Sequence, residues 1–184
     1  MKIKKKRFNK NGLLFGVLFR YLLIVFVSLG NLFIFYKLFT PLTIYPIYFI
    51  LKIFYENTIY SGIIIYINNY SIIFIKSCIA GSAYFLLFAL SFLTPMKPFK
   101  RVYFIFFTFS LFLILNILRI LILIFLLINN SDYFDITHKF MWYVLGTIIV
   151  IGIWFFSVRL FNVKEIPIYS DFKILINIIK NRRK

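Results

Sequence analysis

Long apolar stretches separated by short polar and basic segments dominate the chain. About 20 helical residues are needed to cross a hydrocarbon core roughly 30 Å thick. Four stretches meet or approach that length, and they cover residues 13–36, 77–94, 102–128 and 140–158. The pattern therefore predicts an all-α membrane protein with four transmembrane helices, of which the second is the shortest.

The segment between the first two spans, residues 37–76, carries two different patterns. Its first part, 42–57, is apolar and aromatic and contains two prolines, so we expect an interfacial or re-entrant helix with its tyrosines at headgroup level. Its second part has β-branched runs on both sides of Asn68-Asn69, and Asn tolerates the positive φ of a tight hairpin turn. We expect a small β-hairpin ending just before Cys78; the alternative is that both runs belong to another buried helix.

Composition and charge agree with a membrane protein. Of 184 residues, 62% are apolar and only 15% are charged, which is too few to cover an ordinary globular domain. Seven of the 22 basic residues lie in 1–20, three in 95–101 and seven in 159–184. Short cytoplasmic loops collect Lys and Arg, so both termini are expected in the cytoplasm. Nucleic-acid binding is disfavoured, because the charges are spread over three segments.

Neither repeats nor a polar linker divide the chain, so we expect one integral membrane domain over 1–184. The basic start followed by an apolar run is similar to a signal peptide. That run is too long, however, and no small-residue cleavage pattern follows it, so we expect an uncleaved first span. The tail 159–184 is expected to be cytoplasmic and to end in a short interfacial helix capped by Ser170.

Arg119 is the one basic residue in the middle of an apolar span. A guanidinium at the membrane centre costs roughly 2.5–3.5 kcal/mol on insertion scales, so a compensating interaction is needed. Nine residues separate it from Ile128, about 14 Å of helix, which places it in the outer half of the membrane. Asn116 lies on the same helical face and can hydrogen-bond a neighbouring helix. The alternative is a structural Arg that pairs with Asp132, Asp135 or backbone carbonyls.

The chain has a single cysteine and a single histidine, and both are expected at the outer face with Arg119. A neighbouring cation raises the thiolate fraction of a cysteine, and a guanidinium can donate to an oxyanion formed at a carbonyl. His138 could take the Cys78 proton and return it to a leaving amine. Gly81 and Ser82 would let another helix or a substrate backbone approach closely. These side chains predict nucleophilic chemistry at a membrane surface.

Other kinds of site find less support in the sequence. One Cys and one His cannot make a structural zinc site, and there is no Gly-rich phosphate loop. A serine nucleophile at Ser82 or Ser91 is conceivable, but the only histidine lies near a span boundary and no G-x-S-x-G occurs. We therefore expect no metal and no organic cofactor.

Three short motifs carry a family resemblance. "SCIAGSAYFLL", "NILRI" and "THKFMWYVLG" follow one another in that order over about residues 40–155. The arrangement resembles the exosortase and archaeosortase family of membrane transpeptidases, whose pattern is a Cys after an outer hairpin, an N-x-x-R in the next span and a His or second Arg opening the span after. Two departures are that Ile79 and Ala80 stand between Cys78 and Gly81, and that the chain is shorter than the eight-span members.

The resemblance implies a cysteine transpeptidase of the plasma membrane with its site on the outer face. Its partners would be secreted proteins whose C-terminus carries a recognition motif, a membrane helix and a basic cluster. Cys78 would be the nucleophile, and a lipid or another amine-bearing anchor would be the acceptor. The alternative is a non-catalytic membrane protein, such as an assembly factor or a small transporter subunit, in which Arg119 is a structural or substrate-pairing charge.

Overall fold

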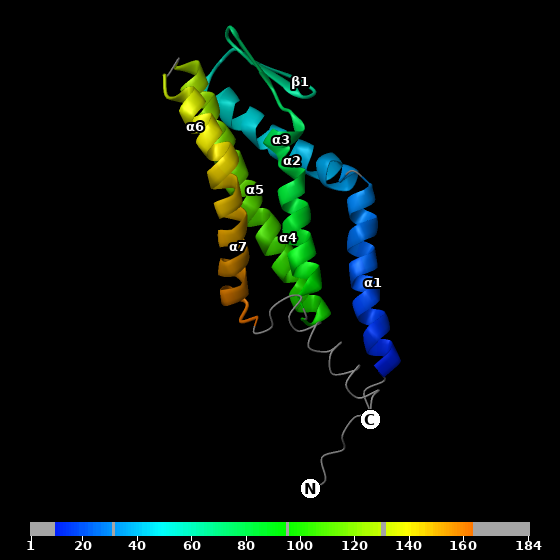
Figure 1. Cartoon of the computed structure of the whole chain (residues 1–184). Coiled ribbons are helices and arrows are strands. Elements are labelled where there is room, and N and C mark those ends of the chain that lie inside the picture. Colours follow the sequence, from blue (N-terminus) through cyan, green and yellow to red (C-terminus); the bar gives the residue numbers. More distant parts are fainter. Residues whose placement is uncertain (1–9, 31, 95, 130–131, 164–184) are drawn as a thin grey trace.

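The computed structural model describes residues 10–30, 32–94, 96–129 and 132–163. Figure 1 shows four helices running along the long axis of the molecule, α1 (Lys10–Leu29), α4 (Gly81–Leu93), α5 (Pro98–Ile128) and α7 (Gly146–Leu160). Near one end lie a crosswise helix and three strands, α2 (Phe33–Phe54), β1 (Thr58–Ser61), β2 (Ile64–Ile67) and β3 (Tyr70–Ile73). The same end holds three short helical segments, α3 (Lys76–Ile79), α6 (Phe134–Phe140) and the π-helical η1 (Met141–Leu145).

Among the described residues, four helical runs are long and apolar enough to cross a membrane, and these are Phe33–Phe54, Lys76–Leu93, Pro98–Ile128 and Phe134–Leu160. The prediction of a mostly helical chain with four apolar helices long enough to cross a membrane is therefore confirmed. The last three runs correspond to the spans expected at 77–94, 102–128 and 140–158, although the run from Lys76 ends at Leu93 and the final one begins earlier, at Phe134. The first run is α2, which is not the segment that the sequence pattern selected as the first span.

The expectation of one continuous span over 13–36 is wrong. Helix α1 ends at Leu29 and α2 begins at Phe33, and Leu32 between them has a left-handed backbone with φ 55°. Gly30 precedes the break, and glycine is among the weakest helix formers because its backbone loses the most freedom on folding. The helix expected at 42–57 therefore starts earlier, at Phe33, and ends at Phe54. After the break α2 turns across the bundle instead of continuing along α1 (Figure 1).

The expected hairpin is present, but it is part of a three-stranded antiparallel sheet. Strands β2 and β3 pair across Asn68-Asn69, and Asn68 has the positive φ of 51° that the turn requires. Strand β1 was not anticipated; it joins β2 through a turn in which Gly62 has φ 62°. The strand order is β1-β2-β3. The alternative of a buried helix over this segment is therefore wrong.

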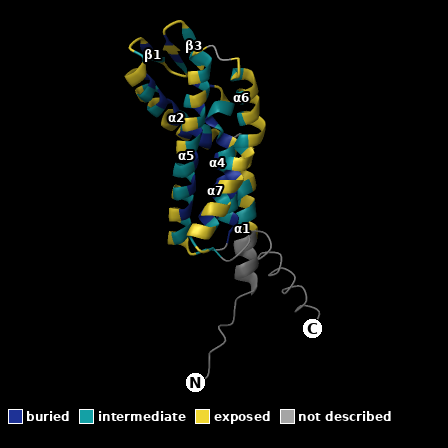
Figure 2. Cartoon of the chain, turned by 90° about the vertical axis from the view of Figure 1, so that its left-hand side faces the viewer, coloured by how far each residue is buried: buried dark blue, intermediate teal, exposed yellow. Residues whose placement is uncertain are grey.

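One face of the sheet is buried, with Ile65 and Ile67 fully inaccessible, and β1 packs against α2. The exposed residues of the long helices lie on their outward sides, while buried residues lie between elements (Figure 2). Large apolar side chains such as Phe106, Ile114 and Phe155 are more than half exposed. An apolar outer surface of this kind suits contact with lipid tails.

Stacked aromatic rings attach α2 to the bundle. The Phe39 ring lies face to face with that of Tyr84 on α4, with 3.5 Å between centroids and 8° between planes. Phe109 and Phe112 of α5 contact the Tyr84 ring edge-on. Tyr84 is fully buried, and its hydroxyl has no hydrogen-bond partner among the described residues. The ring therefore holds three helices together, and its hydroxyl contributes nothing that offsets its burial.

The end of the bundle opposite the sheet holds the start of α1, the α4–α5 connection and the end of α7 (Figure 1). Arg101 closes that connection by donating through Nη2 to the carbonyls of Thr94 and Met96, at 3.3 and 3.5 Å. Its guanidinium also lies 5.3 Å from the centroid of the Phe92 ring. The helix expected after Ser170 falls outside the described residues.

We predict that Tyr84→Ala lowers the free energy of unfolding by about 3–5 kcal/mol, because it leaves a cavity between three helices. Tyr84→Phe keeps the ring, removes only the unpaired hydroxyl and is expected to stay within about 1 kcal/mol of the original protein. Thermal unfolding of the purified protein in detergent measures both. Equal losses in the two variants would mean that the hydroxyl, and not the ring, carries the stability.

Candidate functional site

Cys78 lies on α3, a single helical turn that is separated from α4 by a break in the backbone. Ala80 at the break has a left-handed conformation with φ 56°, which costs a non-glycine residue roughly 1–2 kcal/mol. The turn is closed by hydrogen bonds from the Cys78 amide to the Ile75 carbonyl and from the Ala80 amide to the Lys76 carbonyl. Strained backbone of this kind persists only where surrounding contacts hold it. The run Lys76–Leu93 is therefore interrupted at Ala80 and is not one regular helix over its whole length.

Asn116 of α5 provides such a contact. Its side chain is 2% exposed, and Nδ2 donates a 3.0 Å hydrogen bond to the carbonyl oxygen of Cys78. A buried carbonyl without a donor costs about 1–3 kcal/mol, so this bond fixes the turn that carries the thiol. The Asn116 Oδ1 atom is buried and lacks a partner within the described residues.

The close approach expected at Gly81 is made by a side chain of this chain. A Cβ added to Gly81 would lie 2.7–2.9 Å from ring atoms of Tyr36 on α2, so any larger residue would displace that ring. Gly81 therefore brings α2 against the start of α4, directly after the Cys78 turn. Ser82 is exposed and does not line the cavity around Cys78.

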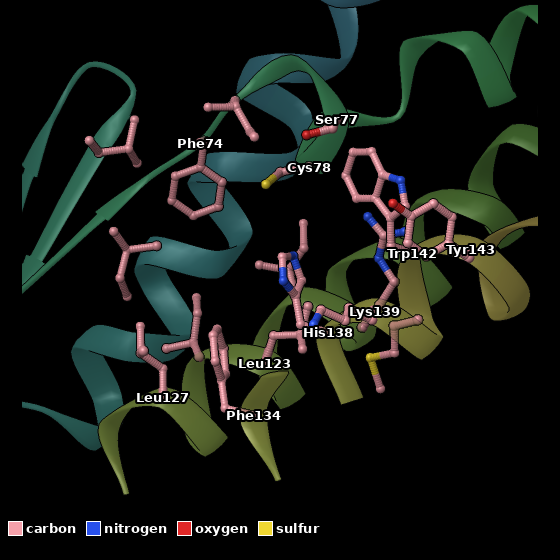
Figure 3. A pocket seen from close by; sticks show the side chains of 17 residues that line it. Phe74, Ser77, Cys78, Leu123, Leu127, Phe134, His138, Lys139, Trp142 and Tyr143 are labelled. Carbon is pink, nitrogen blue, oxygen red and sulfur yellow. The ribbon is translucent and has the colours of Figure 1, made fainter. Parts of the chain in front are cut away.

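A cavity of about 480 Å³ lies between β3, α3, α5, α6 and η1. Cys78, Arg119 and His138, which come from three separate elements, all line it. Figure 3 shows the Cys78 sulfur and the His138 ring projecting into this space, with Phe74, Trp142 and Tyr143 around them. Most of the remaining lining is aliphatic and is made by Ile72, Ile73, Ile75, Ile120, Leu123, Ile124 and Leu127. The fold thus gathers the three candidate residues in one apolar pocket.

Arg119 is half-buried, and its Nε atom is fully buried without a hydrogen-bond partner among the described residues. It is close enough to Cys78 for a direct electrostatic interaction. Within the described ranges it forms no ion pair with Asp132 or Asp135, so those two carboxylates do not compensate its charge. A Cβ built on Gly146 of α7 would lie 3.8 Å from Nη1 of Arg119, so a small residue there leaves room for the guanidinium.

His138 stands inside α6, because the helix begins at Phe134 and not at residue 140 as expected. The imidazole stacks on the ring of Phe134, with 5.7 Å between centroids, and meets the Trp142 ring edge-on at 6.4 Å. Directly after α6 the chain widens into the π-helical η1, a feature often found at functional sites. The widened turn contributes Trp142 and Tyr143 to the cavity wall.

A second cavity of about 610 Å³ lies between α4, α5 and α7 and shares Ser77, Arg119 and Trp142 with the first. Ser82 and Thr147 line it as well. The Ser77 hydroxyl is buried and has no partner in the described part of the chain. Ser77 and Trp142 were not anticipated from sequence, although Trp142 follows His138 by four residues and therefore lies on the same helical face.

The serine alternative receives no geometric support. Ser91 is buried in α4, and its hydroxyl donates at 2.6 Å to the Leu87 carbonyl of its own helix. Neither it nor Ser82 lines the cavity that holds His138. Of the serines considered as nucleophiles, neither Ser82 nor Ser91 shares a cavity with His138, whereas Cys78 does.

Comparison with family models, curated proteins and solved structures found no match to this chain. The chemistry of the site is therefore argued from its own geometry. Among the described residues, no group of three or more His, Cys, Asp or Glu side chains could hold a metal ion. The polar groups that line the first cavity include the Cys78 thiol, the Arg119 guanidinium, the His138 imidazole, the Ser77 hydroxyl and the Lys139 ammonium.

We predict that Asn116→Leu destabilises the protein by about 1–3 kcal/mol, because the Cys78 carbonyl loses its donor inside the bundle. Cys78 is the only cysteine, so its alkylation rate reports on the turn directly, and that rate should change as the turn loosens. Asn129→Leu is the matched control, since it removes an exposed 2.9 Å bond to the Phe125 carbonyl on the same helix. Similar thermal shifts in both variants would contradict a special role for Asn116.

Proposed function

We propose that this chain is a membrane cysteine transpeptidase of the kind that the exosortase and archaeosortase resemblance implies. The observation that carries the proposal is the meeting of Cys78, Arg119 and His138 in one cavity, from α3, α5 and α6. These residues are far apart in sequence, and each supplies a different part of nucleophilic acyl transfer. The arrangement is a nucleophile, a proton carrier and a cation in an apolar pocket.

The reaction begins when His138 accepts the Cys78 proton and the sulfur attacks the scissile carbonyl carbon. The carbonyl π electrons move to oxygen, and Arg119 stabilises the oxyanion. Collapse of this intermediate breaks the C–N bond, and His138 returns the proton to the leaving amine. An acceptor amine then attacks the thioester, loses its proton to His138 and releases the Cys78 thiolate.

The unpaired charge of Arg119 supports a catalytic role. A buried cation without a counter-ion is costly in hydrocarbon, and among the described residues neither an ion pair nor a hydrogen bond donated by Nε compensates it. An oxyanion that forms only during the reaction supplies the missing negative charge. Because that charge is greatest in the transition state, the interaction accelerates the reaction and does not merely bind substrate.

The fold also supports the expected placement in the membrane. The elements α3 and α6, which line the cavity, share one end of the bundle with the sheet, while the start of α1 and the end of α7 lie at the other (Figure 1). With the basic segments on the cytoplasmic side, the cavity opens on the outer face of the plasma membrane. In this arrangement α1, with 20 residues, crosses the membrane together with the runs Lys76–Leu93, Pro98–Ile128 and Phe134–Leu160. Helix α2 is long enough to cross but, because it runs crosswise to the bundle (Figure 1), lies at the outer surface.

The substrate class follows from that placement. A secreted protein held in the membrane by a C-terminal helix presents the residues before that helix to the outer face. Cleavage at Cys78 would release the helix and its basic cluster, and transfer would attach the protein to a lipid or another anchor. The aliphatic lining of the pocket limits water, which favours transfer over hydrolysis. The second cavity gives the acceptor amine a separate approach to Arg119.

We predict that Cys78→Ala abolishes processing of a co-expressed secreted protein from the same genome that carries a motif, a membrane helix and a basic C-terminus. Loss of the nucleophile removes the thioester route, so only the unprocessed form should accumulate on immunoblots of membranes. His138→Gln keeps a polar side chain of similar reach and should insert normally but process slowly. Unchanged processing by Cys78→Ala, or full tolerance of Cys78→Ser, would favour the non-catalytic membrane protein instead.

Arg119→Lys is expected to insert and fold but to lower the processing rate about 10²–10³-fold, as loss of one oxyanion donor does in other acyl transfer enzymes. A lysine keeps the charge but not the planar fork of donors. The processing rate is measured by pulse-chase of the same substrate. The control is Lys76→Arg, which also exchanges one basic side chain for the other at the same end of the bundle. An Arg119→Lys variant as fast as the original protein would remove the oxyanion role.

A further inference from the structure

Strand β3 is an edge strand whose free side is identified by its register. The sheet order is β1-β2-β3, so β3 pairs on one side only. The Phe74 amide donates at 2.9 Å to the Ile63 carbonyl, and in an antiparallel ladder alternate residues point to the partner strand. The backbone N–H and C=O groups of Ile72 and Phe74 therefore point toward β2. Ser71 and Ile73 direct theirs away from the sheet.

These outward backbone groups are open. Ser71 and Ile73 are both exposed, Ile73 to 54%, and neither makes an outward backbone hydrogen bond with any residue that the structure describes. An exposed edge of β-branched residues is a ready template for another strand. Near a membrane the tendency is stronger, because less water is present to satisfy free N–H and C=O groups.

The open edge leads directly into the cavity of Cys78. Ile72, Ile73, Phe74 and Ile75 all line that cavity, and the α3 turn with Cys78 follows at once. A chain paired with β3 would therefore be carried along the cavity wall to the sulfur. No other strand has this property, because β2 is central and β1 is separated from the cavity by β2.

We propose that the donor substrate binds as a fourth strand on the free edge of β3, in the parallel direction. This inference rests on the function proposed above. β3 runs toward α3, and a donor whose membrane helix follows the cleaved bond must also run from the aqueous side toward Cys78. Only parallel pairing places the donor residues that precede the cleaved bond alongside β3, and the donor's membrane helix beyond Cys78. Recognition then uses backbone hydrogen bonds, with side-chain preference supplied by the cavity.

The lining of the cavity gives that preference a chemical class. Ile120, Leu123, Ile124, Leu127 and Phe134 form its wall opposite β3, and the acidic side chains Glu56, Asp132 and Asp135 do not line it. In an added strand every second side chain points to one face. The donor therefore places an apolar side chain next to the cleaved bond and tolerates variation at the neighbouring position.

Site-directed photo-crosslinking tests the position and the direction of the donor. A benzophenone amino acid replaces Ser71 or Ile73 in the Cys78→Ala protein, which retains uncleaved donor, and the full chain is co-expressed with the secreted protein described above. Crosslinks are expected to donor residues before the cleaved bond, and those from position 71 should lie farther from the bond than those from 73. The control is Ile59 on β1, about 14 Å from an added strand at the usual strand spacing, which should give none.

Crosslinks in the reverse order would overturn the parallel direction, and crosslinks only between two copies of this chain would show that β3 pairs with itself. Equal labelling from position 59 would overturn binding at the β3 edge. The proposed function has its own readout, because loss of processing in Cys78→Ala does not depend on where the donor binds. If processing still depends on Cys78 but positions 71 and 73 give no donor crosslinks, strand addition at β3 is rejected and the proposed function stands.

A measurement on the unaltered protein avoids any effect on folding. Synthetic peptides that span the donor junction carry one N-methyl group at successive positions and compete with processing in detergent. Only every second N–H of an added strand faces β3, so N-methylation at those residues should weaken inhibition about tenfold or more. N-methylation at the residues between them should change inhibition less than twofold. A flat profile along the peptide would overturn strand addition.

Discussion

One hydrogen bond between helices, from the Asn116 amide on α5 to the Cys78 carbonyl, underlies the geometry of this end of the molecule. It holds a single helical turn that is offset from α4 by the left-handed Ala80. Tyr36, packed against Gly81, presses on the same junction from α2. Without these contacts the chain from Lys76 to Leu93 would relax toward one regular helix, and the sulfur would leave the wall of the cavity.

The cavity is useful because it combines an apolar wall with an uncompensated cation. Arg119 has its Nε atom buried without a partner among the described residues, and it lines the same cavity as Cys78. Electrostatic interactions are stronger where water is excluded, so one guanidinium has a large influence on a sulfur or on an oxyanion. His138, held between Phe134 and Trp142, adds a proton carrier beside an aromatic wall. The exposed edge strand β3 borders the same space.

Local patterns predicted local features of the fold. Asn68-Asn69 between β-branched runs predicted the β2–β3 hairpin, and the apolar run around Arg119 predicted the long helix α5. The same approach failed at Gly30, where apolar residues continue on both sides and hydropathy gives no sign that the helix ends at Leu29. It also missed β1, whose pairing depends on a turn at Gly62 and on packing against α2.

What the sequence determined by itself is the membrane class, the approximate helical segments, and the few side chains able to carry chemistry, because each of these depends on residue type and short-range spacing. Only the tertiary structure decided that Cys78, Arg119 and His138 share a cavity, that Ser77 and Trp142 border it, and that neither Asp132 nor Asp135 pairs with Arg119. Those facts depend on how α3, α5 and α6 pack and on a backbone break at Ala80. Packing between helices is set by contacts among residues distant in the chain, which no local pattern contains.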